Sequence, residues 1–158
     1  MAVDINTIGM LARREIEARI AGPIIDAFIK EFGEERTLKI VKDVITGLAK
    51  ESGQQLRESV GGNSLRHFMK GMELWKKDDA YEAEILEQSE TKLSTNTTRC
   101  RYAEMYKELG MEKLGVILSC GRDFALMEGF NPSIKLTRTQ TIMEGAPYCD
   151  FRYCMEKK

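Results

Sequence analysis

The sequence has very little histidine and lacks the paired cysteines that hold structural zinc. His67 is the one histidine among 158 residues, which rules out a histidine-rich metal site and disfavours a Ser-His-Asp triad. The four cysteines contain no CxxC pair, so a zinc ribbon is excluded. A pair of His67 with Cys100 or Cys120 stays open, although the helix that carries His67 is far from both in the sequence.

The chain also lacks a charge excess and a long apolar run. Lys and Arg total 24 against 25 Asp and Glu, for a formal net charge of -1, so we expect no nucleic acid partner. No stretch reaches the roughly 20 apolar residues of a membrane-spanning helix, and the first residues do not show the basic start and apolar run of a signal peptide. We therefore expect a cytoplasmic protein with no membrane partner, whose cysteines are free thiols, ligands or nucleophiles rather than disulfides.

Length and patterning predict a single domain over residues 1–158, made of two halves. Apolar residues recur every three to four positions through residues 1–76, which predicts a helical half. We expect Gly22-Pro23 to end a first helix and begin a second, and Gly33 to end the second. Gly61-Gly62 should end the third helix, and a fourth should follow.

Residues 80–155 show a different pattern, in which alternating, threonine-rich segments flank helical ones. The expected order is strands at 80–89 and 92–98, helices at 101–109 and 111–127, and strands at 134–143 and 148–155. Because hairpins pair antiparallel strands and the helices are grouped apart from them, the sequence predicts the α+β class. We expect the N-terminal helices to pack on a small twisted antiparallel sheet of about four strands, built from two hairpins that helices separate.

The last third of the chain concentrates the residues that carry chemistry. Cys100, Cys120 and Cys149 all fall there, close in sequence to several carboxylates and arginines. Cys120 and Asp123 are three residues apart on an expected helix, so they share a face, and Asp123 at the edge of a core needs a polar partner. Arg138 lies on the otherwise apolar face of an expected strand and should answer a carboxylate, either of this chain or of a ligand. A purely structural ion pair and a role in a site are both open.

Four motifs stand out in the same region. They run from Thr97 to Gly115 (TxRCxYxxxYxxLGxxxLG), Cys120 to Asp123 (CxxD), Phe130 to Pro132 (FNP) and Arg138 to Tyr153 (RTxTIMxGxxxCDFRY). Together with the helical half, they resemble the L-2-amino-thiazoline-4-carboxylic acid hydrolase family over nearly the whole chain. The ending GxxxCxF is also similar to vinyl-reductase ligand-binding domains, whose fold is shared with vesicle-tethering adaptor subunits. These resemblances imply a domain in which helices pack on a twisted antiparallel sheet.

The family resemblance implies hydrolysis of a cyclic isothiourea with a carboxylate, such as 2-amino-thiazoline-4-carboxylate, to a carbamoyl-cysteine. This reaction needs a nucleophile or an activated water, a base, and a group that holds the substrate carboxylate. The catalytic candidates are Cys100, Cys120, Asp123, Cys149 and Asp150. The candidates for substrate binding are Arg138, Thr141, Glu144 and Arg152, of which the two arginines suit a carboxylate. The candidates for the base are Asp123, Glu144 and Asp150.

Other interpretations stay open beside this one. A divalent metal such as zinc accepts thiolates and carboxylates, and its candidate ligands are Cys100, Cys120, Asp123 and Cys149. The vinyl-reductase likeness implies a non-catalytic small-molecule-binding or sensor domain instead of an enzyme, and an adaptor is a third class. The Ile- and Phe-rich N-terminal helices further predict an apolar surface for a second copy, so a homodimer is expected.

Overall fold

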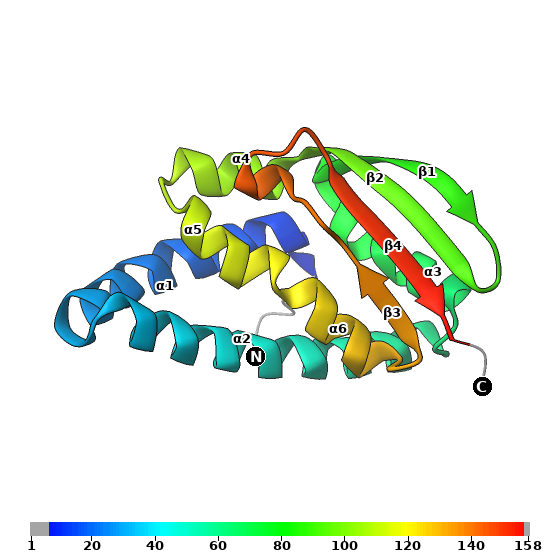
Figure 1. Cartoon of the computed structure of the whole chain (residues 1–158), viewed down its shortest axis with the longest axis horizontal. Coiled ribbons are helices and arrows are strands. Elements are labelled where there is room, and N and C mark those ends of the chain that lie inside the picture. The colour runs from blue at the N-terminus through cyan, green and yellow to red at the C-terminus, as the bar shows by residue number, and fades with distance from the viewer. Residues whose placement is uncertain (1–6, 157–158) are drawn as a thin grey trace.

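The computed structural model describes residues 7–156, in which helices pack against a four-stranded sheet (Figure 1). The predicted α+β class and the antiparallel sheet are confirmed. The α-helices are α1 (Met10–Phe32), α2 (Glu34–Val60), α3 (Leu65–Lys76), α4 (Arg101–Glu108), α5 (Glu112–Gly115) and α6 (Arg122–Phe130). The strands are β1 (Tyr81–Gln88), β2 (Lys92–Cys100), β3 (Ile134–Thr137) and β4 (Cys149–Met155), and the short helical turns are η2 (Lys77–Asp79), η3 (Val116–Cys120) and η4 (Ile142–Glu144).

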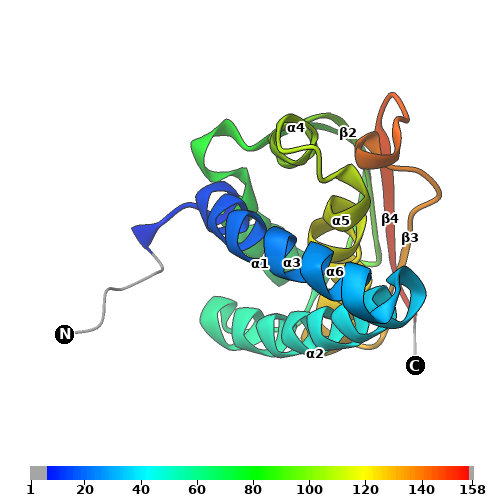
Figure 2. The same cartoon turned by 90° about the vertical axis from the view of Figure 1, so that its left-hand side faces the viewer.

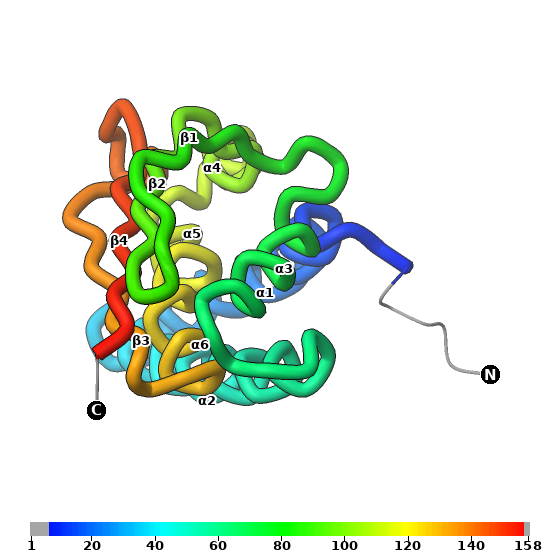
Figure 3. The backbone as a smooth tube through the Cα atoms, turned by 90° about the vertical axis from the view of Figure 1, so that its right-hand side faces the viewer, coloured from blue at the N-terminus to red at the C-terminus, as the bar shows by residue number. Residues whose placement is uncertain are grey.

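The strands pair in the order β1-β2-β4-β3, and every pairing is antiparallel. The helices of the described residues all lie on one side of this sheet (Figures 2 and 3). On the covered face, Thr97 of β2 lies opposite Cys149 of β4, and Thr95 lies opposite Phe151. Because side chains alternate along a strand, the sheet presents hydroxyl, thiol and aromatic side chains to the helices.

α1 is longer than the sequence predicts, because Gly22-Pro23 does not divide it. Proline removes one backbone hydrogen bond from the helix, yet buried residues on either side of this point hold the two halves in line. Gly22 is buried, and a Cβ there would meet the side chain of Met111 at 2.6 Å, so this glycine serves close packing rather than a break. Gly33, at a φ of 87°, ends α1 as predicted. No helix among residues 7–156 is both long enough and apolar enough to span a membrane.

The predicted helix at 111–127 is instead made of three consecutive segments, α5, η3 and α6. η3 is a π-helical turn, in which the amide of Gly121 donates to the carbonyl of Val116 at 2.7 Å. Such a turn inserts one extra residue into the helix, and it frequently marks a functional site. Ser119 and Cys120 of this turn line the cavity described below, together with residues of α6 that follow it.

The predicted strand at 134–143 is also shorter, since β3 covers only its first 4 residues. The carboxylate of Asp150 accepts hydrogen bonds from the amides of Thr139 and Gln140, both at 2.9 Å. The hydroxyl of Thr141 accepts one from the amide of Glu144 and caps the turn η4. Both side chains bond to backbone amides that would otherwise pair with a neighbouring strand, so the strand ends early. The alternation of residue types in the sequence does not reveal such bonds.

α2 crosses α6 at close range, and two glycines make this possible. A Cβ on Gly53 of α2 would lie 2.1 Å from the carbonyl oxygen of Leu126, and a Cβ on Gly129 of α6 would lie 2.0 Å from that of Lys50. Both oxygens belong to helix backbone, which does not move aside as a flexible side chain does. Because α6 also carries Asp123, this contact fixes where the cavity wall stands.

Gly53→Ala should lower the free energy of unfolding by about 2–3 kcal/mol, since the added methyl group forces the two helices apart. Gly47→Ala is the matched control, because it lies on the same helix with nothing within 4 Å of an added Cβ, and it should stabilise the protein by up to about 1 kcal/mol. Urea unfolding followed by circular dichroism measures both values. Equal effects of the two substitutions would contradict the close crossing of α2 and α6.

Candidate functional site

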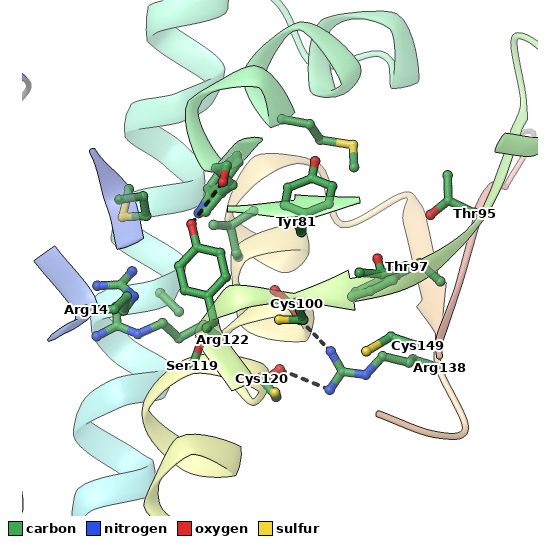
Figure 4. Close-up of a pocket in the computed structure, with 18 of the residues that line it drawn as sticks. Arg14, Tyr81, Thr95, Thr97, Cys100, Ser119, Cys120, Arg122, Arg138 and Cys149 are labelled. Carbon is green, nitrogen blue, oxygen red and sulfur yellow. Dashed lines mark hydrogen bonds and ion pairs between the residues drawn. The ribbon is translucent and has the colours of Figure 1, made fainter. Parts of the chain in front are cut away.

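A cavity of about 170 Å³ lies between the covered face of the sheet and helices α1, α2, α3 and α6 (Figure 4). Much of its wall is apolar and includes Phe68, Trp75, Leu126 and Phe151. For scale, an apolar cavity of about 150 Å³ in another protein accommodates benzene. The space therefore suits one small ring with a substituent.

Three of the four cysteines line this cavity. Cys100 ends β2, Cys120 ends the turn η3, and Cys149 begins β4, so the fold brings together thiols from three separate elements. Burial raises the pKa of Cys100 to about 11, and it raises the pKa values of Cys120 and Cys149 as well. Thiols with raised pKa values stay protonated at neutral pH and are weak nucleophiles. The fourth cysteine, Cys154, is exposed.

Asp123 and Arg138 form an ion pair at the cavity wall. Nη1 of Arg138 donates to a carboxylate oxygen of Asp123, and Nη2 donates to the carbonyl of Cys120 at 3.0 Å. The guanidinium also lies over the rings of Phe124 and Phe151, with its Cζ 5.1 and 5.2 Å from their centroids. The side chain of Arg138 is only 7 % exposed, so these contacts hold it in place on several sides.

The carboxylate of Asp123 is enclosed by protein but faces the cavity, where 38 % of its side-chain surface is open. Burial raises the pKa of Asp123 above its ordinary value, while Arg138, Arg14 and Arg122 act in the opposite direction. A carboxylate with a raised pKa beside an open space is suited to accept a proton from a substrate or a water. Asp123 is therefore the candidate base of the cavity.

Two further arginines, Arg14 of α1 and Arg122 of α6, line the cavity on the side away from Arg138 (Figure 4). Their side chains are each 12 % exposed, and both bond to the carboxylate of Glu17, at 2.8 Å from Arg14 and 3.5 Å from Arg122. Nε of Arg122 also donates to the carbonyl of Leu118 at 2.7 Å. Neither arginine is among the candidates that the sequence predicts, because the charges around Arg14 look like an ordinary solvated helix face.

The other candidates from the sequence do not line the cavity. Asp150 holds the loop after β3 through two backbone amides, so Arg138 answers Asp123 and not Asp150. Thr141 and Glu144 bond to each other at 2.7 Å, and Arg152 donates to the neighbouring strand β2. His67 bonds to the residue that caps its own helix α3, and it is not paired with a cavity cysteine.

The proposed metal ligands share the cavity without forming a metal site. The candidates Cys100, Cys120, Asp123 and Cys149 all line it, but Asp123 is already bonded to Arg138. Within residues 7–156, no group of three or more His, Cys, Asp or Glu side chains is placed so that it could hold a metal ion. Zinc binding therefore stays a prediction of the sequence alone.

The sequence matches one family model over most of its length. This model, described as L-2-amino-thiazoline-4-carboxylic acid hydrolase, matches residues 13–153, a range that includes every cavity arginine and cysteine. The chain belongs to this family. The resemblance that its motifs predict is thereby confirmed. Among curated proteins, no sequence matches the chain.

Two solved structures share the fold of this family member. The phenol-responsive sensory domain of the transcription activator PoxR, with phenol, has a TM-score of 0.53 at 9 % identity, and the match covers 85 % of this chain and 72 % of that chain. A trafficking protein particle complex subunit 3 from Naegleria fowleri, covalently bound to palmitic acid, has a TM-score of 0.54 at 9 % identity, with 92 % and 96 % covered. At this level of identity, the likeness shows the fold alone.

The raised thiol pKa values predict slow alkylation of the cavity cysteines. At about pH 8, iodoacetamide should modify Cys100 about a hundredfold more slowly than an ordinary thiol of pKa 9.0, because a pKa of about 11 leaves about one hundredth of the thiolate, and it should modify the exposed Cys154 first. Timed labelling followed by peptide mass spectrometry measures each rate, and Cys154→Ser removes the fast site as a control. Rapid labelling of any cavity cysteine near neutral pH would contradict the enclosed site.

Proposed function

We propose that this family member hydrolyses a small cyclic substrate at an amidine-like carbon, as in the opening of 2-amino-thiazoline-4-carboxylate to a carbamoyl-cysteine. The observation that carries the proposal is the carboxylate of Asp123, which faces a cavity sized for one ring and has a raised pKa. Membership of the family supports the class of reaction.

In the proposed reaction, water adds to the ring carbon that lies between sulfur and nitrogen. Asp123 accepts the proton that the water loses as the new C–O bond forms. The addition turns the C=N double bond into a single bond, and the new hydroxyl gives its remaining proton to the former imine nitrogen as the carbonyl forms. The carbon at the same time releases its ring nitrogen or its ring sulfur, and the leaving atom takes up the proton from Asp123. The net change is the addition of one water molecule, so the reaction needs no oxidant or reductant.

Arg138 acts in this proposal by positioning Asp123 rather than by binding the substrate. Its two terminal nitrogens already bond to Asp123 and to the carbonyl of Cys120, and two aromatic rings enclose the guanidinium. This differs from the interpretation of the sequence, in which Arg138 or Arg152 holds the substrate carboxylate. A base whose geometry is fixed before the substrate arrives transfers its proton with less reorganisation.

Water is a better attacking group here than a cavity thiol. Burial raises the pKa values of Cys100, Cys120 and Cys149, so their thiolates are scarce at neutral pH. The sulfur of Cys149 also accepts a hydrogen bond from the amide of Ile142 at 3.2 Å, which gives it a structural partner. In the proposal the three thiols form part of the cavity wall, because a thiol is a small polarisable group that packs well against a ring.

Asp123→Asn should lower kcat by about a hundredfold or more, because asparagine keeps the shape of aspartate but accepts no proton. In the wild type, kcat/KM should rise with pH as Asp123 loses its proton, at a pH above the ordinary aspartate range because burial raises its pKa. That rise should disappear in the variant. Mass spectrometry detects the gain of one water, and a thiol reagent shows whether the C–S or the C–N bond has broken.

Asp150→Asn is the matched control, since it removes a carboxylate that lies outside the cavity, and its kcat should stay near that of the wild type. Loss of one partner of a buried ion pair costs about 3–5 kcal/mol, so Asp123→Asn must first be shown to unfold cooperatively in a melting experiment, and the control is measured in the same way. A folded Asp123→Asn with unchanged turnover would remove Asp123 from the mechanism. Wild-type protein that binds the compound tightly without turnover would instead favour the sensor-domain alternative.

A further inference from the structure

We propose that Arg14 and Arg122 form an anion subsite in the cavity, which binds the carboxylate of a small ring-shaped ligand. The inference rests on the proposed function only for the nature of the ring. Three observations support the subsite itself. They are an excess of one positive charge, guanidinium nitrogens that donate to no described residue, and the position of the two arginines relative to Asp123.

The three arginines that line the cavity carry one positive charge more than the two carboxylates bonded to them. Arg138 has Asp123 as its partner, whereas Arg14 and Arg122 share the single carboxylate of Glu17. The two arginines are largely removed from water, and a buried cation without a full counter-charge costs free energy. A ligand with one negative charge would complete this cluster.

Both arginines keep donors that a ligand can use. Arg14 bonds to Glu17 through Nη1, while Arg122 uses Nε for the carbonyl of Leu118 and Nη2 for Glu17. No described residue accepts a hydrogen bond from Nη2 of Arg14 or from Nη1 of Arg122. Burial and the neighbouring charge of Arg14 both lower the pKa of Arg122, which shows that the two guanidiniums repel each other. A carboxylate between them would relieve this repulsion and accept bonds from both.

The subsite and the base occupy different sides of the cavity. In Figure 4, Arg14 and Arg122 lie on the left and Arg138 on the right, with Cys100 and Cys120 between them. A carboxylate held by the two arginines therefore leaves the ring of the ligand in the space beside Asp123. A single carboxylate is favoured over a phosphate dianion, because one unneutralised charge needs one counter-charge and the space holds one ring.

The test compares two ligands that differ in charge but not in shape, cyclopentanecarboxylate and cyclopentanecarboxamide, by titration calorimetry. Neither has an amidine carbon, so binding is measured without the proposed reaction and a failure of one idea is distinct from a failure of the other. Wild-type protein should bind the carboxylate about tenfold or more tightly than the carboxamide, as expected for a hydrogen bond to a charged group.

Arg14→Gln and Arg122→Gln should each remove most of this preference for the carboxylate. Arg19→Gln is the matched control: it also removes one positive charge from α1, but from an exposed residue paired with Glu15, and the preference should persist. Glu17→Gln should shift the preference in the opposite direction and tighten carboxylate binding, because it removes the competing internal carboxylate. A purely structural role of the cluster predicts no such gain.

Three results would overturn the subsite. These are equal binding of the two ligands by wild-type protein, no binding of the carboxylate at millimolar concentration, and a carboxylate preference that survives in both folded arginine variants. None of them bears on whether Asp123 supports hydrolysis, which the turnover experiment decides separately.

A different observation carries a second inference, on the outer surface of α1 and α2, which we call the α1–α2 face. α1 exposes a large apolar side chain at every fourth position, 49 % to 62 % open, in the row Ile16, Ile20, Ile24, Phe28 and Phe32. α2 exposes a second row with the same spacing, 47 % to 57 % open, in Ile40, Val44 and Leu48. The groove between the two helices contains Ile25, Val41 and Leu118.

We infer that the α1–α2 face binds the same face of a second copy of this chain. Residues four apart form ridges, and helices pack by placing a ridge into a groove, so a face that has both is complementary to itself about a twofold axis. Eight half-exposed side chains offer roughly 800 Å², which is the area that each partner buries in a stable interface. Rim charges such as Arg19 with Glu15 and Lys39 with Asp43 are paired within the chain, so these four residues add no net charge to the contact.

Light scattering with size-exclusion chromatography at tens of micromolar tests this interface. Wild-type protein should be a dimer, and Phe28→Glu and Val44→Glu should each give a folded monomer, because either places a charge within the contact. Leu86→Glu is the control, since Leu86 is an equally exposed apolar residue on β1, and this variant should stay dimeric. A monomeric wild type, or a dimer that survives both substitutions on the α1–α2 face, would overturn the inference.

Discussion

The buried ion pair between Asp123 and Arg138 is the interaction on which the cavity depends. It joins α6 to the segment that follows β3 and so closes one wall between the helical layer and the sheet. A guanidinium that is largely removed from water is stable only because a carboxylate, a carbonyl and two aromatic faces replace that water. Burial in this wall raises the pKa of Asp123, while the contact with Arg138 acts in the opposite direction and fixes the position of the carboxylate.

Local periodicity in the sequence is sufficient to predict the α+β class, the four strands and the approximate ends of most elements. This prediction fails where a side chain bonds to nearby backbone amides and so replaces the regular hydrogen-bond pattern. It also fails where a residue makes room for a contact with a distant part of the chain. Asp150 and Thr141 bond to nearby amides and shorten the third strand, and Gly22 makes room for Met111 instead of ending a helix. The π-helical turn η3 is not predicted from the sequence either, since no local pattern distinguishes it from the helix around it.

The same distinction separates the site residues that the sequence predicts from those that it misses. The three thiols and Asp123 lie on β2, η3, α6 and β4, which all fall in the last third of the chain and border the same cavity, so their concentration in the sequence predicts that they meet. Arg14 comes from the opposite end of the chain and reaches the cavity only because α1 lies against it. Its local sequence does not separate it from Arg19, yet Arg14 is 12 % exposed and Arg19 is 60 % exposed. Partners that tertiary packing supplies leave no trace in a local pattern.

The cavity and the α1–α2 face are connected through η3. Leu118 contributes to the groove on the outer surface, while Ser119 and Cys120 line the cavity inside. The carbonyl of Leu118 also accepts the hydrogen bond from Nε of Arg122, so the backbone that forms part of the groove orients an arginine of the anion subsite. A π-helical turn is a less stable backbone than the α-helix on either side of it. One turn therefore contributes to the groove and to the cavity wall, and its backbone also orients Arg122.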